Sequence, residues 1–188
     1  MLLSALLLTA CSFVPTAKDD TKPAPLQEIP AAAQAAFDSA LAAQRAQRWS
    51  DAEQQLQQLG ERYPQLAGPS LNLALIYAQT QRPQLAETAF KRALQINPGN
   101  LDACEQYGIW LRGQGRFSEA EAMYLQTLAR DPARANAHLD LAILYDLYMG
   151  KLPQALEHYQ RYLALAADDK SPVQGWVADL QRRMKVPG

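Results

Sequence analysis

Few residues of this chain could carry out nucleophilic, acid–base or metal chemistry. Its histidines are His138 and His158, and its cysteines are Cys11 and Cys104. Neither histidine has a serine or cysteine at a spacing typical of an activated nucleophile, and two isolated imidazoles do not complete a metal site. We expect both histidines to be packing residues. We predict that the protein is not an enzyme and that it holds no metal and no cofactor.

The chemistry of Cys11 is of another kind, because this residue ends a short apolar segment. Residues 2–8 are mostly apolar and lead into Leu8-Thr9-Ala10-Cys11. The segment is too short to span a bilayer, and it resembles a bacterial lipoprotein signal peptide. The resemblance implies that residues 1–10 are removed and that Cys11 carries the lipid. No Lys or Arg precedes the segment, and a start codon a few residues upstream would explain this. The alternative to a lipoprotein signal is a cysteine that follows an apolar start by chance.

Composition restricts the fold and the partners. With 18 basic and 19 acidic residues, the net charge is −1, and no basic run marks a nucleic-acid partner. Ala, Leu, Gln, Glu and Arg are abundant while Val, Ile and Thr are scarce, which favours helices over sheet. Residues 11–31 differ, because prolines fall among charged residues there and prevent a long helix. We predict an extended tether between the lipidated cysteine and a folded domain.

One interval organises the rest of the chain. A proline and an alanine each recur every 34 residues. Such a period indicates that one supersecondary unit is copied along the chain. We predict four units of two helices each, at residues 33–66, 67–100, 101–134 and 135–167. The prolines are Pro64, Pro98 and Pro132, and the alanines are Ala52, Ala86, Ala120 and, after 35 residues, Ala155.

Other positions keep the same phase. The first helix of each unit has a small residue at its middle, and a large apolar residue follows each repeated alanine four places later, on the same helical face. With the 34-residue period, this pattern resembles the tetratricopeptide repeat family. The resemblance implies an all-α, right-handed α-solenoid of about four helix-turn-helix units within residues 32–170. The small residues are Ala40, Ala74, Gly108 and Ala142, and the large ones are Leu56, Phe90, Tyr124 and Tyr159.

The C-terminal end departs from the regular pattern. The fourth unit contains one extra residue near positions 149–150, because Ala155 comes one place late. Ser171-Pro172 can begin a further helix with proline at its first position. Apolar residues then recur at helical spacing. We predict that residues 171–188 form a capping helix and a tail.

In the family that this sequence resembles, the first helices line a concave surface. The corresponding positions here are almost all apolar, and an exposed apolar surface usually marks binding. We interpret them as a groove for an extended segment or an amphipathic helix. The alternative is that these side chains pack as core, between helices or against the tether. The positions are Phe37, Leu41, Leu71, Leu75, Glu105, Ile109, Leu139 and Ile143, with Leu147 one turn further on.

The remaining candidates have simpler interpretations. Some tetratricopeptide proteins bind the carboxylate end of a chaperone tail with basic and amide residues. The matching positions here are apolar, so we do not expect that use. Asp102, Arg112 and Asp146 are either polar guides at the groove edge or solvated charges. Cys104 lies early in a first helix, where we expect a buried, inert thiol.

The resemblance implies a short tetratricopeptide lipoprotein that faces the periplasm. Ser12 follows Cys11, and a residue other than Asp at this place usually permits export to the outer membrane. The expected partners are a protein of the cell envelope, in pilus, secretion or cell-wall assembly, and the membrane through the lipid on Cys11. Self-association into a homo-oligomer and an accessory role in an envelope enzyme complex are the alternatives.

Overall fold

The computed structural model of the protein describes residues 29–167 and 170–185. These residues form helices and no strand, so the described chain is all-α as predicted. Cys11, the predicted signal peptide and most of the predicted tether lie outside the described residues. The helices are α1 (Ala31–Arg45), α2 (Trp49–Arg62), α3 (Ala67–Gln79), α4 (Pro83–Ile96), α5 (Leu101–Gly113), α6 (Phe117–Arg130), α7 (Ala135–Ile143), the π-helix η1 (Leu144–Met149), α8 (Leu152–Leu165) and α9 (Ser171–Lys185).

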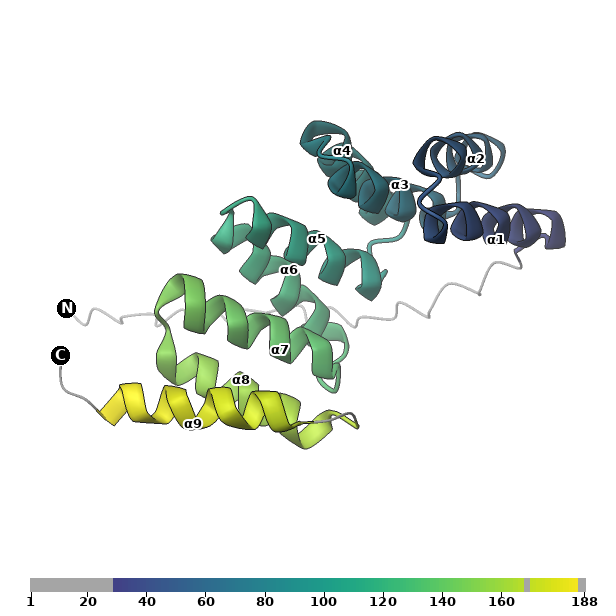
Figure 1. Ribbon diagram of the computed structural model, residues 1–188. Coiled ribbons are helices and arrows are strands. Elements are labelled where there is room, and N and C mark those ends of the chain that lie inside the picture. The colour runs from purple at the N-terminus through teal and green to yellow at the C-terminus, as the bar shows by residue number, and fades with distance from the viewer. Residues whose placement is uncertain (1–28, 168–169, 186–188) are drawn as a thin grey trace, which may run out of the picture.

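The helices form a solenoid of antiparallel pairs. Figure 1 shows the pairs following one another from α1 and α2 at one end to α8 and α9 at the other. Each pair turns at a residue with a left-handed backbone, and the four turns share one register. In the first two turns this residue is a glutamine, Gln47 or Gln81, each with φ 57°. In the last two it is a glycine, Gly115 or Gly150, which adopts positive φ without steric cost.

Small residues allow the two helices of a unit to approach closely. Ala74 and Ala86 are fully buried between α3 and α4, beside Phe90. In the third unit the small residue is Gly108, and a Cβ added there would lie 2.6 Å from the ring of Tyr124. The repeated alanines and the large residues after them therefore form the core of the solenoid.

The fourth unit absorbs its extra residue in a π-helical turn. Helix α7 continues into η1, and Gly150 ends this segment with φ 65°. A π-helical turn holds one residue more than an α-helical turn, so the following helix α8 resumes the register. Helix α9 then packs on α8 and buries Val173 and Leu180, while Trp176 remains 44% exposed.

Membrane-spanning segments were sought along the described chain. Within it, no helix combines the length and apolar character that crossing a bilayer requires.

Candidate protein-binding groove

A row of apolar side chains runs across the first helices of the four units. Leu41, Leu75, Ile109 and Ile143 lie on α1, α3, α5 and α7, each 34 residues after the previous one. All four are half-buried, and Leu147, one turn beyond Ile143, is 65% exposed. These side chains line surface cavities at both ends of the array. We call the row and these cavities the groove.

The N-terminal end of the groove holds two adjoining cavities. The first, of about 360 Å³, lies between α1, α3 and α5, and the second, of about 320 Å³, lies between α1, the start of α2 and α3. Gln44 and Trp49 line both, so we treat them as one N-terminal cavity. Its wall is apolar and amide-bearing. It consists of Leu41, Gln44, Arg45, Trp49, Asn72, Leu75, Ala78, Gln79, Gln106, Ile109 and Trp110.

The C-terminal end of the groove holds a cavity with charged walls. It measures about 480 Å³ and lies between η1, α8 and α9, next to the π-helical turn. The carboxylate of Asp146 is buried in its wall and accepts a hydrogen bond of 2.5 Å from Arg183. The other lining residues are Ile143, Leu147, Tyr159, Trp176 and Asp179.

The remaining predicted groove residues are less open. The ring of Phe37 lies under Gly68, where an added Cβ would be 3.3 Å from it. Leu71 and Leu139 are half-buried and pack against the core, as Leu75, Ile109 and Ile143 also do, but they do not line the cavities of the groove. Glu105 is only 6% exposed, and Nε of Arg134 donates to it over 2.7 Å. The structure thus commits Glu105 to an ion pair with the residue that directly precedes α7, and its contact with a partner stays a prediction.

The charged residues expected at the groove edge are also engaged in ion pairs. Arg134 pairs with Asp102 as well as with Glu105. Arg112 on α5 reaches Asp140 on α7 over 3.1 Å. Burial of Asp140 raises its pKa to about 6, even though the charge of Arg112 acts in the opposite direction. The Arg112–Asp140 pair connects the third unit to the fourth, and the Arg134 pairs hold the start of α7 against α5.

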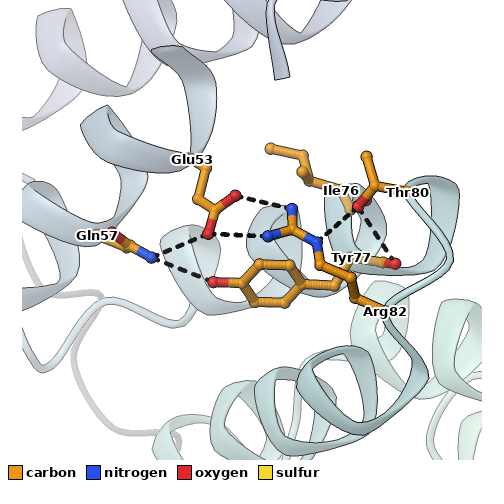
Figure 2. A network of polar contacts seen from close by, with 6 residues as sticks. All are labelled: Glu53, Gln57, Ile76, Tyr77, Thr80 and Arg82. Atoms are coloured by element: carbon orange, nitrogen blue, oxygen red, sulfur yellow. Dashed lines mark hydrogen bonds and ion pairs between the residues drawn. The ribbon is translucent and has the colours of Figure 1, made fainter. Parts of the chain in front are cut away.

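A second set of ion pairs links successive units near the turns. Arg82, which directly precedes α4, donates to both carboxylate oxygens of Glu53 on α2, over 3.2 and 2.7 Å. Figure 2 shows the guanidinium of Arg82 above the ring of Tyr77, with its centre 4.5 Å from the ring centroid. Gln57 donates to the hydroxyl of Tyr77 over 3.2 Å and completes this contact between the first two units.

The same contact recurs along the array. Arg116 pairs with Glu87 over 2.9 Å, and Lys151 pairs with Glu121 over 2.8 Å. Sequence reasoning missed these links, although the phase of Arg48, Arg82 and Arg116 repeats every 34 residues and was a visible signal. We call the three pairs between units the inter-repeat ladder. It consists of Arg82–Glu53, Arg116–Glu87 and Lys151–Glu121.

Of the side chains that could take part in chemistry, Cys104 and His138 are buried and His158 is half-buried. Cys104 is fully buried, as expected, and burial raises the pKa of its thiol, which disfavours the reactive thiolate. His138 and His158 contact each other between α7 and α8. In the part of the chain that the structure describes, no three His, Cys, Asp or Glu side chains gather in a way that could hold a metal ion.

Comparison with known families matches the tetratricopeptide repeat three times. The matches cover residues 34–65, 65–133 and 111–180, which is nearly the whole described solenoid. The chain carries tetratricopeptide repeats. The predicted family is thereby confirmed for the array, and the tetratricopeptide fold is typically a non-catalytic scaffold that binds other proteins. No curated protein matches the sequence.

Solved structures support the same fold. The structure from the functional characterisation of Pseudomonas aeruginosa pilF is 26% identical, with a TM-score of 0.74, and the match covers 82% of this chain and 69% of that one. MamA from Desulfovibrio magneticus RS-1 is 18% identical, with a TM-score of 0.64, over 82% of this chain and 97% of that one. YrrB, described as a tetratricopeptide protein with an unusual peptide-binding site, is 19% identical, with a TM-score of 0.62, over 82% and 75%.

Proposed function

We propose that this tetratricopeptide protein is a lipid-anchored adaptor of the bacterial envelope. Cys11 carries the lipid and holds the chain at the periplasmic face of the outer membrane. The repeats bind a segment of another envelope protein in the groove, and the tether gives the array its reach from the membrane. The lipoprotein-like sequence 8–11 and the likeness to Pseudomonas aeruginosa pilF support this bacterial setting.

The observation that carries the proposal is the open apolar row. Leu75 and Ile109 are half-buried and line a cavity, and Leu147 is mostly exposed. Such side chains gain little from folding where they face water, but burying one on a partner contributes about 1.5–3 kcal/mol. Contiguous apolar surface of this kind usually marks an interaction site. YrrB, which has a similar fold, is described as having a peptide-binding site, and this supports the proposal.

Site-specific photo-crosslinking tests this proposal in the native cell. A benzophenone amino acid at Ile109 places the probe in the groove, and the same amino acid at Leu125 places it on α6, where the wild-type side chain is 45% exposed. We expect one envelope protein to crosslink from position 109 and not from position 125. Equal crosslinking from both positions, or none from 109, would contradict groove binding.

Self-association is the second candidate function. The C-terminal cavity lies beside exposed Leu147 and Trp176, which a second copy of the chain could cover. Sedimentation of the lipid-free protein separates the two candidates. A monomer over the micromolar range supports the adaptor, whereas a concentration-dependent dimer that Trp176→Ser abolishes supports self-association.

A further inference from the structure

One buried polar atom beside the groove has no partner. Oε1 of Gln44 is excluded from solvent and accepts no hydrogen bond within the described parts of the chain. Buried polar groups are paired in the great majority of cases, so an unpaired amide oxygen next to a cavity requires an explanation. The Gln44 side chain lines both parts of the N-terminal cavity. The bond that carries its amide group can rotate at little energetic cost. A small rotation therefore presents this oxygen to whatever fills the cavity.

The other polar groups of the N-terminal cavity are amides and indoles. Gln79 and Gln106 can each donate and accept hydrogen bonds, and the indole nitrogens of Trp49 and Trp110 can only donate. Both kinds of group suit a polypeptide backbone, which offers an N–H and a C=O at each residue. The wall carries a single formal charge, that of Arg45. A charged occupant would be poorly compensated here, in contrast to the C-terminal cavity with its two aspartates and an arginine.

The backbone conformation of the occupant follows from the unpaired acceptor. A helix satisfies its own N–H groups beyond the first turn, so its side presents none to Gln44. An extended strand leaves its N–H groups free and directs alternate side chains to opposite faces. Such a segment can donate to Oε1 of Gln44 and insert an apolar side chain between Leu75 and Ile109 at the same time.

We propose that the N-terminal cavity binds an extended, uncharged segment of the partner protein, with a backbone N–H of that segment donating to Oε1 of Gln44. This inference rests on the proposed function, because it assumes that the groove is the binding site. It goes further, since it excludes an amphipathic helix from this end of the groove and makes Gln44 the residue that recognises the backbone. Asn72 supports the site from its rim, where its side-chain nitrogen already donates to the carbonyl of Gly68 over 3.0 Å.

Selection of peptides on the full-length protein in detergent tests the inference. The probe is a library of short random peptides, and the tightest binder is then measured by fluorescence anisotropy. We expect uncharged binders with apolar residues at every second position. Methylation of one particular backbone nitrogen of the peptide should weaken binding about five- to tenfold, the effect of losing one hydrogen bond. The variant Gln44→Leu should bind with similarly reduced affinity and should be insensitive to that methylation.

Gln58→Leu is the matched control, because Gln58 lies on α2 and lines a different cavity. It should bind like the wild type and keep its sensitivity to methylation. Binders with helical apolar spacing, or an unchanged affinity of Gln44→Leu, would overturn the inference. If the selected peptides contradict the inference in either way but still bind the Leu75→Ser variant more weakly than the wild type, the proposed groove stands and only the inference about Gln44 fails. If no peptide binds, or if Leu75→Ser binds like the wild type, the proposed groove fails as well.

Discussion

Nδ1 of His138 lies 2.9 Å from Nδ1 of His158, and Nε2 of His138 lies 3.0 Å from the carbonyl oxygen of Pro132. The carbonyl can only accept, so Nε2 of neutral His138 carries a proton and Nδ1 of that ring accepts from His158. The pair joins α7 to α8 inside the fourth unit. A proton on both Nδ1 atoms at once would leave this contact without an acceptor.

This pair predicts a stability that depends on pH. Burial, and then the positive charge of His138, lowers the pKa of His158 below its usual value of about 6.5. Between the two pKa values, His158 is therefore protonated in the unfolded chain and neutral in the folded chain. The contribution of His158 is complete above about pH 6.5 and is lost as the pH falls through the lower pKa of the folded state.

Thermal melts between about pH 8 and about pH 5 check this dependence. The wild type should lose stability toward acid relative to His158→Gln, which lacks the imidazole of residue 158. Comparison with the variant removes the contribution of Asp140, whose raised pKa of about 6 acts with the opposite sign. A constant difference between the two proteins across the range would refute the prediction.

Replacing Gly108 and Gly113, both on α5, with alanine should change stability in different ways. A Cβ at Gly108 would meet the ring of buried Tyr124 at 2.6 Å, while a Cβ at Gly113 would meet nothing within 4 Å. Gly108→Ala should therefore overpack the third unit and cost about 1–3 kcal/mol of unfolding free energy. Gly113→Ala should be neutral or stabilising by up to about 1 kcal/mol, because alanine favours helix. Urea unfolding of both variants measures the contrast, and equal effects would refute the close packing.

The inter-repeat ladder predicts a loss of stability when its acidic member is neutralised. Burial alone would raise the pKa of Glu121, but hydrogen bonds from Lys151 and Tyr145 outweigh it, and the pKa is lowered. The pair's contribution is therefore present above about pH 4.3 and is lost as the pH falls further. At neutral pH, Glu121→Gln should cost about 1 kcal/mol in urea unfolding. The exposed Glu61→Gln is the control and should unfold like the wild type.

The repeats could be predicted from sequence because their packing depends on residue size at fixed spacing. Ala86 and Ala120 are fully buried as that spacing requires, and Pro83 is the first residue of α4. A proline at the first helical position loses no intrahelical hydrogen bond, so it indicates the start of a helix without any knowledge of distant residues. The packing positions of one unit recur every 34 residues. A single sequence therefore shows the same pattern of residue sizes several times, which makes the repeat recognisable.

Side-chain contacts across helices that no repeated motif marks were not predictable in the same way. The contact between His138 and His158 joins residues that are 20 positions apart, and no motif marks it. The burial of Glu105 depends on the reach of Arg134 from 29 residues away. The choice between groove and core for Leu75 depends on how neighbouring units tilt, since a small rotation of one helix exposes or covers the same side chain.

Lipidation of Cys11 remains a prediction from the sequence alone. Mass spectrometry of the protein from a bacterial membrane should find a chain that begins at residue 11 with an acylated cysteine. Cys11→Ser should leave the protein soluble or unprocessed. An unmodified Cys11 in the wild-type protein would contradict the anchor and leave the repeats without a defined attachment to the membrane.

The central claim is that the apolar row stabilises a complex rather than the fold, and one double variant tests it directly. Leu75→Ser with Ile109→Ser should lower the melting temperature only slightly, because both side chains already face the N-terminal cavity, and should abolish capture of the protein that crosslinks at position 109. Core residues would give the opposite result, because two buried large-to-small changes cost several kcal/mol, a large part of a domain's stability. Circular dichroism melts and capture are measured on the same preparation. A variant that stays folded and loses its partner is the predicted result, and a variant that unfolds early contradicts the account.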